Sequence, residues 1–539
     1  MTAREQLAQF AAGSKALPRL CREYKKERAT VHLKELVGGA LSFYAAAAAA
    51  KTGGVHVFVA EDRDAAAYLM NDFYNLLDEK QVYFFPSSYK RSVAYGAEDA
   101  QGVVQRTAAM NAVKGFTKGY LIVCTYPEAL AERVADAETL RRDTIAVKVG
   151  DSISIAVLED ALVDANFTRV DFVYEPGQYS VRGGIVDVFS FSESKPYRID
   201  FFGDEVDSIR RFNISSQLSA DKLDRVEIIP NLNAGDGAAK VSFVQFAGDA
   251  AAYWFYDADY VLRRVNDIRR RTLADMERPE EIDRLMTSRN ALLGDLANCR
   301  MLALRDNLPE RPATAAVEFD TAPQPKFNKN FEMLADDIIR NSLRGYTTYI
   351  LSENKVQVER LENIFHQIGR GQAVVRPLSV TLHEGFVDND LKLCLYTDHQ
   401  IFDRYQRYRI NGEIRRDEQM TVAELNQLRP GDYVVHIDHG VGRFDGLVKI
   451  NENGKAHEAI KLVYKDGDVL FVNVHSLHRI SRYKSGDGEP PKVYKLGNGA
   501  WQKLKNATKK AVKDISRELI ALYAKRKASN GFAFTPDSY

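Results

Sequence analysis

The chain has 539 residues, far more than one hydrophobic core holds, so several domains are expected. Basic residues (Lys+Arg) and acidic residues (Asp+Glu) both number 74, and the resulting net charge of zero excludes a globally basic nucleic-acid binder, although local patches remain possible. No stretch reaches the ~18 apolar residues of a membrane span, "MTAREQLAQF" is no signal peptide, and the cysteines form no CxxC or CxxH pair, so we expect a cytoplasmic protein with free thiols.

Residues 1–134 have the pattern of an α/β domain. The runs "VHVFVA" (55–60) and "YLIVCT" (120–125) are short and continuously apolar, and the segments between them, "DRDAAAYLMNDFYNLL" and "DAQGVVQRTAAMNAVKG", have helical periodicity. Continuous apolar strands that alternate with helices predict a parallel sheet. Asp62 or Asp64 is expected to cap the first of these helices.

The stretch "ELVGGALSFYAAAAAAK" (35–51) has the strand–loop–helix order of a phosphate-binding loop without its chemistry. Such a loop needs spaced glycines, a lysine for the phosphates and a hydroxyl for Mg²⁺. Here Gly38 and Gly39 are adjacent, the lysine and hydroxyl pair is missing, and Glu128 stands alone where an acidic pair would follow a strand. We therefore predict a degenerate loop (Gly38, Gly39, Ser42) that binds no cofactor, and no catalytic residues.

Residues 135–232 change to an alternating, antiparallel β pattern, with a hairpin in "FFGDEV" that turns at Gly203 and Asp204. Arginines recur along these strands, and they have two interpretations. They form a patch that docks an acidic protein or nucleic acid, or they form cross-strand ion pairs with acidic residues of the same strands. The arginines are Arg169, Arg182, Arg198, Arg210 and Arg211, and the acidic residues of the second interpretation are Asp187, Asp200 and Asp207.

In the segment 233–320, residues 250–312 are charged and helix-rich, and "ERPATAAVEFD" is similar to a strand that returns to the first sheet. Residues 321–418 form a second, small α/β domain. Its strands are "TTYILSE" and "LKLCLYTD", and its helix, "NKVQVERLENIFHQIG", ends at a glycine. We find no catalytic constellation in this domain.

Residues 424–485 are all β, with turn glycines between short alternating strands, which suggests a small barrel. Two histidine pairs, His436/His439 and His475/His478, raise the question of zinc. A spacing of three on a strand places side chains on opposite faces, and no cysteine lies nearby, so we predict no metal site. Residues 486–539 have the spacing of a long amphipathic helix, which would be a strut between domains.

The last two segments carry a family resemblance. "GDYVVHIDHGVGRFDGL", "LFVNVHSLHRISRY" and "KLGNGAWQKLKNATKKAVKDIS" closely resemble the transcription-repair coupling factors, the Mfd family. "YSVRGGIVDVF" and "RIDFFGDEVDSIR" are similar to the UvrA-binding domain of UvrB. The resemblance implies a multidomain α/β and β protein: a degenerate RecA-like or UvrB-like α/β domain with an inserted β-rich domain, a small α/β domain, a CarD-like barrel of SH3/Tudor type and a long C-terminal helix.

The resemblance also implies a function. The barrel would bind the β subunit of a stalled RNA polymerase, and the β-rich domain would recruit UvrA. A DNA translocase motor that uses ATP and Mg²⁺ and holds double-stranded DNA would lie beyond Tyr539. The chain would then be the adaptor part of such a factor, a monomer without its own enzymatic activity or bound cofactor, and not bound to a membrane.

Where this sequence matches the motifs of the family, the resemblance implies which residues bind UvrA and which bind the polymerase. Those for UvrA are Arg169, Arg182, Arg198, Glu205 and Arg210. Those for the polymerase are Arg443, Leu447, Lys449 and Ile450, on the segment "GLVKI" (446–450), which we expect to be an edge strand open to strand addition. Leu447 has the alternative of being barrel core, whereas Ile450, beside a polar turn, is the better candidate for exposure.

Two other functions remain open from the residues alone. The chain could be a subunit of a nucleotide-dependent helicase or repair enzyme, which would require the degenerate loop to be active. It could also be a DNA-binding module that uses the basic face of residues 503–527. Neither alternative accounts for the barrel.

Overall fold

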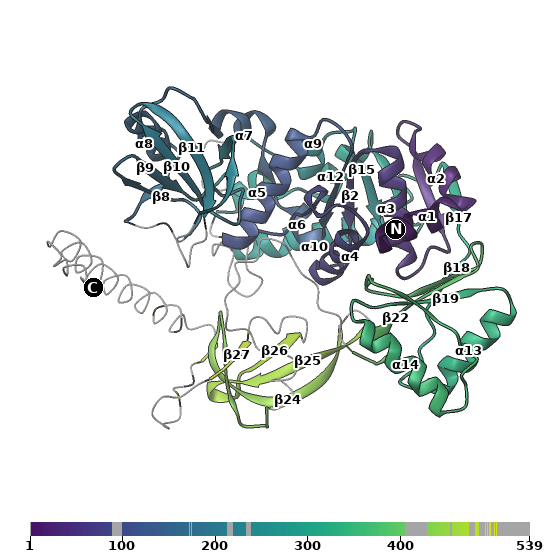
Figure 1. The fold of residues 1–539 in the computed structure, drawn as a ribbon. Coiled ribbons are helices and arrows are strands. Elements are labelled where there is room, and N and C mark those ends of the chain that lie inside the picture. Colours follow the sequence, from purple (N-terminus) through teal and green to yellow (C-terminus); the bar gives the residue numbers. More distant parts are fainter. Residues whose placement is uncertain are drawn as a thin grey trace, which may run out of the picture. The chain divides into compact units, whose positions relative to one another are not determined.

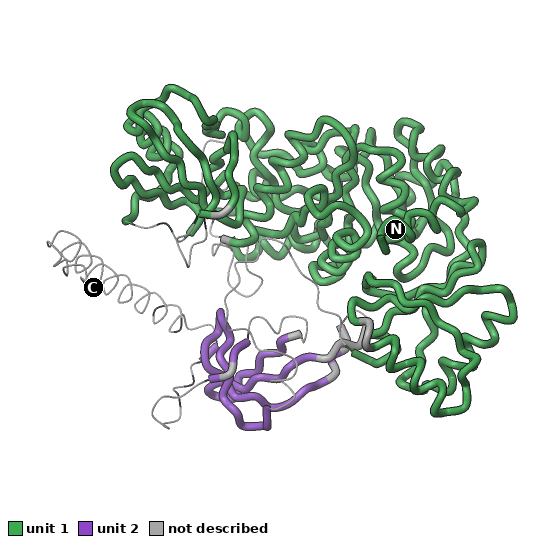
Figure 2. The backbone as a smooth tube through the Cα atoms, viewed as in Figure 1, with its two compact units in different colours: residues 1–414 green, residues 415–539 purple. Residues whose placement is uncertain are grey.

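The computed structural model describes residues 2–88, 100–171, 173, 175–212, 219–232, 239–276, 278–404, 428–452, 455–473, 480–483, 491, 493, 495–496, 501 and 503. The chain divides into two compact units, residues 1–414 and 415–539 (Figure 2). Each unit has hydrophobic cores of its own. The architecture is that of a multidomain α/β and β protein, as predicted.

A seven-stranded parallel sheet forms the centre of unit 1, in the order β17-β1-β16-β15-β2-β4-β3. Its pairings are all parallel, as predicted. "ERPATAAVEFD" supplies β17, which returns to pair with β1. The strands are β1 (Thr30–Lys34), β2 (Gly54–Val59), β3 (Val82–Phe84), β4 (Tyr120–Thr125), β15 (Ala252–Phe255), β16 (Arg300–Ala303) and β17 (Ala315–Glu318).

Helices flank this sheet (Figure 1). Because crossovers are right-handed, the connection from β1 to β2 and the oppositely directed connection from β15 to β16 place their helices on opposite faces. The helices are α1 (Ala3–Ala12), α2 (Ala16–Tyr24), α3 (Ala40–Thr52), α4 (Arg63–Leu76), α5 (Ala100–Gly115), α6 (Pro127–Ala131), α7 (Ala137–Asp143), α9 (Phe243–Ala247), α10 (Ala258–Asp275), α11 (Ile282–Leu285) and α12 (Arg289–Leu296), with 3₁₀ turns η1 (Glu79–Gln81) and η2 (Pro279–Glu281).

Two of these helices show how local sequence sets local structure. Asp62, one of the two predicted caps, accepts a hydrogen bond from the backbone N–H of Ala65 at 2.8 Å and so begins α4. The alanine-rich helix α3 is buried around most of its circumference, because its small side chains let α2, α4 and the sheet approach closely.

The β-rich module of unit 1 has a six-stranded sheet in the order β12-β11-β10-β9-β8-β7, over a core of its own. The pairings are antiparallel except for β7 with β8. The predicted hairpin joins β10 and β11 through two residues, and Gly203 takes a φ of +63° at the turn. The elements are β5 (Val134–Ala135), β6 (Ile145–Lys148), α8 (Ile155–Asp164), β7 (Thr168–Arg169), β8 (Gln178–Arg182), β9 (Ile185–Val188), β10 (Tyr197–Phe202), β11 (Glu205–Phe212), β12 (Ser219–Leu223), β13 (Arg225–Ile228) and β14 (Lys240–Val241).

The small α/β domain of unit 1 has a five-stranded sheet in the order β18-β21-β22-β19-β20. Alternating residues of β22 face two different cores. Cys394 and Tyr396 pack with α13 and α14, whereas Leu395 joins the core of the seven-stranded sheet. The elements are β18 (Thr321–Pro323), α13 (Phe331–Leu343), β19 (Thr347–Leu351), α14 (Lys355–Gln367), β20 (Arg376–Leu378), β21 (Phe386–Asp388), β22 (Leu393–Thr397) and α15 (Asp398–Ile401).

Unit 2 contains a five-stranded antiparallel sheet in the order β26-β25-β24-β23-β27. Over the part of unit 2 that the structure describes, no pairing joins β26 to β27, so closure into a barrel stays a prediction. Of the predicted long helix, only residues 501 and 503 are described, and the rest lies outside the described residues. The elements are β23 (Tyr433–His436), β24 (Gly440–Glu452), β25 (Lys455–Val463), η3 (Lys465–Gly467), β26 (Val469–Asn473) and β27 (Ile480–Arg482).

A buried histidine stabilises the centre of the parallel sheet. Trp254 donates its indole N–H to His56 Nδ1 at 3.1 Å, and His56 Nε2 lies 3.0 Å from the carbonyl oxygen of Gly53. Because Nδ1 accepts, Nε2 carries the proton and donates to Gly53, so the neutral ring satisfies both contacts. Burial lowers the pKa of His56 to about 4.

We predict a specific loss of stability in mild acid. The unfolded chain protonates His56 near pH 6.5, whereas the folded chain resists protonation down to about pH 4, so this group lowers the free energy of unfolding as pH falls between these values, by up to ~3 kcal/mol. Denaturant unfolding followed by tryptophan fluorescence measures this, since Trp254 is one of only two tryptophans. In His56→Gln this part of the pH dependence should disappear; an unchanged slope would contradict the assignment.

Candidate functional site

The degenerate loop between β1 and α3 is in contact with the small α/β domain. Gly38 has a φ of +55°, and its α-carbon faces the carbonyl oxygen of Gly385. Gly39 lies closer still, because a Cβ built there would be 2.1 Å from the carbonyl oxygen of Glu384. The two predicted glycines therefore allow a close approach of protein backbone.

The Ser42 hydroxyl forms its hydrogen bonds within the same contact. Its hydroxyl oxygen lies 2.8 Å from Asp72 Oδ2 and 3.0 Å from the carbonyl oxygen of Gly39, but it has only one proton to donate. Burial raises the pKa of Asp72 to about 7, against hydrogen bonds from Ser42 and His383 that lower it. When Asp72 is neutral, its own O–H donates to Ser42 and the Ser42 hydroxyl donates to Gly39, so each group is satisfied.

The small domain supplies the other half of this contact through residues 381–385. The backbone N–H of His383 donates to Asp72 Oδ1 at 2.7 Å, and the His383 ring stacks on Tyr68 with centroids 3.7 Å apart. Asn75 donates to the carbonyl oxygen of Thr381 at 2.9 Å. We call this contact the loop seal; it places protein against the loop where a nucleotide hydrolase would hold phosphate.

The predicted arginine patch is built on ion pairs within the β-rich module. Asp187, fully buried, accepts from Arg182 and from Arg198, whose Nε lies 2.7 Å away. Asp200 accepts from Arg210. The ion-pair interpretation is therefore confirmed for Asp187 and Asp200. In the part of the chain that the structure describes, no ion pair is recorded for its third acidic residue, Asp207.

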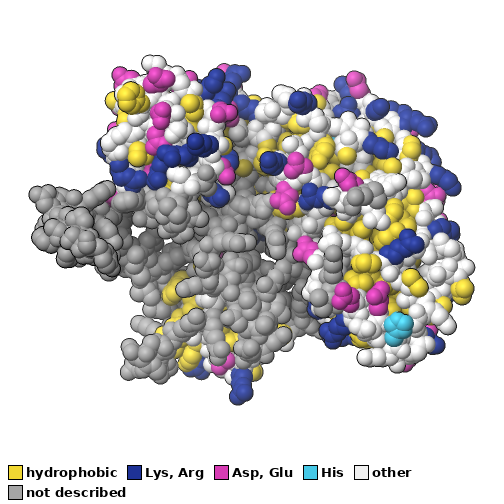
Figure 3. All heavy atoms as spheres, in the orientation of Figure 1, with side chains coloured by type: hydrophobic (Ala, Val, Ile, Leu, Met, Phe, Trp, Pro, Cys, Tyr) yellow, Lys and Arg dark blue, Asp and Glu magenta, His cyan; other side chains and the backbone are white. Residues whose placement is uncertain are grey.

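Strand register nevertheless brings several basic side chains together. Arg198 pairs with Arg210, and Arg210 pairs with Lys222 on the next strand, so the three share one face of the sheet. Arg182 reaches this face through Asp187. Figure 3 shows lysine and arginine side chains gathered on this module at the upper left. Lys222 was not predicted, because only the register places it beside the arginines.

The other two predicted UvrA-binding residues lie apart from this row. Arg169 is on β7, and its guanidinium is 2.6 Å from Glu159 of α8. Glu205 is exposed and begins β11 beside the hairpin turn. The most exposed apolar side chain beside it is Phe202, 83% accessible at the end of β10. Phe202 was also missed, although "FFGDEV" places two phenylalanines on opposite faces and only Phe201 packs on the core.

The predicted edge in unit 2 is present. β23 pairs with β24 only over 440–443, whereas β25 pairs with β24 from Arg443 to Glu452. Within the described residues, the segment 446–452 is thus hydrogen-bonded along one edge only. An open edge of this kind is able to accept another strand.

The predicted polymerase-binding residues do not share one face of this strand. Leu447 pairs with the buried Ile460 on the core side but is 45% exposed, so the alternative that Leu447 is core is wrong. Ile450 is partly exposed on the opposite face, three residues on. Arg443 lies on the ring of Tyr433 and donates to its hydroxyl at 3.1 Å. The side chain of Lys449 lies outside the described residues; its backbone pairs with Glu458.

Two further exposed residues lie on the outer strand β26. Val469 and Phe471 are 39% and 51% exposed and point to the same face. These two residues were not predicted from the sequence. The run "VLFV" (469–472) is continuously apolar, so in a sheet with a core on one face it places apolar side chains on the uncovered face as well.

The expectation that His436 and His439 lie on opposite faces is wrong. Their ring centroids are 4.8 Å apart, because β23 ends at His436 and His439 lies in the following turn. The side chain of His436 is buried. Within the described part of the chain, no three or more potential metal ligands gather at one place. The second pair, His475/His478, lies outside the described residues.

The turn after β23 is closed by an aromatic side chain. Trp501 donates to the carbonyl oxygen of Ile437 at 3.1 Å and packs on Gly440, where a Cβ would lie 2.7 Å from the indole. Tyr464 similarly covers Gly442. The glycines of "GVG" are thus required by the aromatic residues above them. All four cysteines are free, and no helix in the described ranges has the length and apolarity needed to cross a membrane.

Two family models match the chain at these surfaces. One, described as the UvrB interaction domain, matches residues 145–233. These residues contain the hairpin and the basic row, which consists of Arg182, Arg198, Arg210 and Lys222. The other, described as the CarD-like/TRCF RID domain, matches residues 428–484, which contain the open edge. The chain therefore combines a region similar to the UvrB interaction domain with a region similar to the CarD-like/TRCF RID domain.

The relatives make this more specific. The chain is 25% identical over 590 residues to the transcription-repair-coupling factor of Bacillus subtilis, and the match covers 94% of this chain and 49% of that protein. The Escherichia coli factor is likewise 25% identical over 575 residues, with 94% and 50% covered. The resemblance to the N-terminal part of the transcription-repair-coupling factors is thus confirmed, and the chain spans about half the length of the relatives it matches.

The loop seal predicts an asymmetry between two glycines. Gly39→Ala introduces a Cβ against the backbone of Glu384 and should lower the free energy of unfolding by ~1–3 kcal/mol. Gly294→Ala, within α12 and facing open space, should be neutral or stabilise by up to ~1 kcal/mol. Denaturant unfolding and limited proteolysis check both variants. Equal stability of the two would show that the seal is loose.

The buried ion pairs predict a second asymmetry. Asp187→Ala leaves Arg198, whose side chain is only 15% exposed, without its carboxylate and should cost ~3–5 kcal/mol. Asp204→Ala, at the exposed hairpin turn, should change stability by less than ~0.5 kcal/mol. Thermal unfolding of both variants measures the difference. If Asp187→Ala lowered the stability only slightly, the ion pairs of Asp187 with Arg182 and Arg198 would contribute little to folding, and the two arginines would not be needed for it.

Proposed function

We propose that this chain is the adaptor part of a transcription-coupled DNA repair factor. Through the β-rich module it recruits UvrA, and through unit 2 it binds the β subunit of RNA polymerase. The observation that carries the proposal is the presence in one chain of a UvrB interaction domain and a CarD-like/TRCF RID domain, each with an exposed recognition element.

Those recognition elements differ in kind. The β-rich module presents a basic row and an aromatic hairpin tip, and complementary charge gives such contacts specificity and a high association rate. Unit 2 presents an unpaired strand edge, where backbone hydrogen bonds supply affinity and alternate side chains supply choice. An acidic surface fits the first element, and a β-strand edge on the partner fits the second.

The activity of the whole factor extends beyond these modules. A motor in the remaining half would hydrolyse ATP with Mg²⁺ on double-stranded DNA and displace the stalled polymerase. In this scheme the adaptor works as a cytoplasmic monomer, catalyses nothing itself and holds no cofactor. The loop seal supports that assignment, since Gly38, Gly39 and Ser42 are engaged with protein groups. A nucleotide-dependent enzyme subunit remains the alternative, and ATPase activity lost in Ser42→Ala would favour it.

The test is capture of purified UvrA and purified polymerase β subunit by the intact chain. Phe202→Ser removes a ring that is 83% exposed and should weaken UvrA capture about tenfold or more. Ile450→Arg places a charge at the open edge and should weaken capture of the β subunit only. Each change leaves the other partner bound.

Matched controls separate contact from misfolding. Val163→Ser alters an exposed apolar residue on α8 of the same module, and Lys465→Glu alters an exposed turn of unit 2; both should bind normally. If each partner is captured equally by its variant and by the unaltered chain, the assignment of these surfaces fails. Loss of both partners from a single change indicates misfolding.

A further inference from the structure

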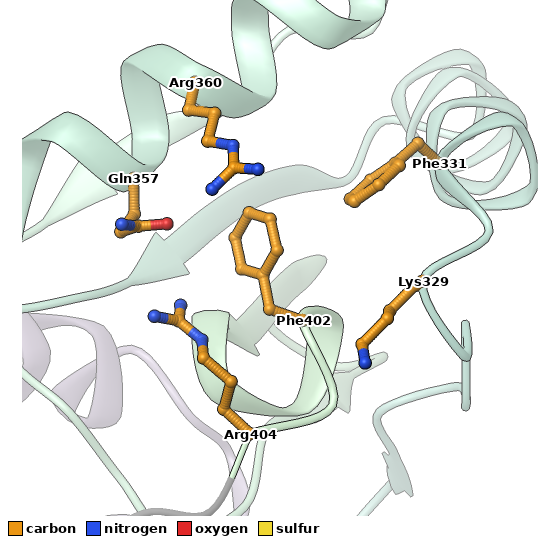
Figure 4. A pocket seen from close by; sticks show the side chains of 6 residues that line it. All are labelled: Lys329, Phe331, Gln357, Arg360, Phe402 and Arg404. Atoms are coloured by element: carbon orange, nitrogen blue, oxygen red, sulfur yellow. The ribbon is translucent and has the colours of Figure 1, made fainter. Parts of the chain in front are cut away.

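The small α/β domain contains a cavity of about 330 Å³ that none of the proposed partner contacts uses. Three cationic side chains, two phenylalanines and one amide line it (Figure 4). We call it the cationic cavity, and its lining residues are Lys329, Phe331, Gln357, Arg360, Phe402 and Arg404.

The cavity lies where the topology of an α/β sheet places ligands. β19 ends at Leu351 and leads to the turn of α14 that carries Gln357, and β22 ends at Thr397 and leads through α15 to Phe402. β18 runs parallel to β22, because both are antiparallel to β21, and it leads to the start of α13 at Phe331. The lining residues thus follow the carboxyl ends of three co-directional strands, the edge at which open α/β sheets bind ligands.

The cations of the cavity exceed the carboxylates beside it. Arg404 lies 3.3 Å from Asp398, which also accepts a 2.8 Å hydrogen bond from Ser352. Lys329 is 3.8 Å from Asp403, and both side chains are largely exposed, so that pair is weak. For Arg360, the described residues place no carboxylate within ion-pair distance. A net positive charge remains to be matched by a ligand.

The two guanidinium groups converge on one ring. Arg404 lies 4.8 Å and Arg360 5.7 Å from the centroid of Phe402, and Figure 4 shows both groups directed toward the ring with the Gln357 amide beside them. Cation–π attraction holds each arginine beside this ring, and both carry a positive charge. An anion reached by both guanidinium groups would offset these charges and accept paired N–H bonds from each fork.

Packing alone does not explain this cluster. Arg360, Arg404 and Lys329 are exposed, so folding does not need their charged ends. Arg360 differs in this respect from Arg198 and Arg210 of the β-rich module, each of which donates to a carboxylate of its own sheet. The rings of Phe331 and Phe402, with centroids 5.7 Å apart, add an apolar wall beside the cations. Cation pair, amide donor and aromatic wall together match a phosphate that is attached to a flat ring.

We propose that the cationic cavity binds a nucleoside phosphate, with the phosphate between Arg360 and Arg404 and the base against Phe331. The phosphate comes from a free mononucleotide or from a single-stranded nucleic acid threaded past the cavity. This site is separate from the degenerate loop and independent of the proposed partner contacts. It gives the small α/β domain a binding role of its own.

The test is direct binding to the full chain. Isothermal titration with adenosine monophosphate and fluorescence anisotropy with a labelled oligothymidylate measure the two sources, and inorganic phosphate measures the anion alone. We expect Arg360→Gln and Arg404→Gln each to weaken binding about tenfold or more, because each removes charge-assisted hydrogen bonds. Binding of the oligonucleotide should fall as salt rises.

A matched variant controls for charge. Arg344→Gln removes an exposed arginine at the far end of α13, ~20 Å along the helix from Phe331, and should bind like the unaltered chain. Circular dichroism verifies that every variant is folded, and the UvrA and β-subunit captures are expected to be unchanged by all three. Tight binding of the mononucleotide that the cavity variants weaken supports the free-nucleotide source; binding of the oligonucleotide alone supports the nucleic-acid source.

The proposal is overturned by any of three results. The first is no binding of mononucleotide or oligonucleotide at millimolar concentration. The second is binding that Arg344→Gln weakens as much as the cavity variants do. The third is binding of inorganic phosphate as tightly as the nucleotide, since the aromatic wall would then contribute nothing.

Discussion

The loop seal, where the two α/β parts of unit 1 meet, surrounds the buried carboxyl group of Asp72. Asp72 receives the backbone N–H of His383 from the small domain and is hydrogen-bonded to Ser42 at the start of α3. Around it, Leu382, Phe386 and Leu395 extend the core of the seven-stranded sheet into the small domain. A polar group at the centre of this apolar contact fixes its register, since any displacement would leave a buried donor or acceptor unpaired. The loop between β1 and α3 therefore contributes to the position of the small domain on the sheet.

Local patterns in the sequence predicted local structure well. The cap at Asp62, the turn at Gly203 and the glycine after α14 depend on neighbours within a few residues, which a sequence displays directly. The central strands β15 and β16 were not predicted, because "AYWF" and "RMLA" are four-residue runs within a segment that is otherwise charged and helical. Their strand conformation comes from pairing in the middle of the sheet, which overrides local propensity.

The candidate sites show the same boundary between local and long-range information. That some arginines of the β-rich module would pair with carboxylates followed from alternation, but which arginines share Asp187 depends on how β8, β9 and β10 align. The contact of Glu384 with Gly39 joins residues about 345 positions apart and leaves no mark in either segment. The proximity of His436 and His439 required knowing where β23 ends. In each case the missing quantity was register or packing, which one sequence does not contain.

The strand order of the first sheet has a consequence for how the chain folds during synthesis. In the described sheet β1 pairs with β16 on one side and β17 on the other, and Thr30 aligns with Met301, so about 270 residues separate the partners. At roughly 5–20 residues per second, β1 waits on the order of a quarter of a minute to a minute for its partners to emerge from the ribosome. The β-rich module between them has its own core and is complete sooner. This order of events leaves the apolar strand β1 without its sheet partners for longer than any other strand of the sheet, and it ties successful folding to an element near the start of the chain.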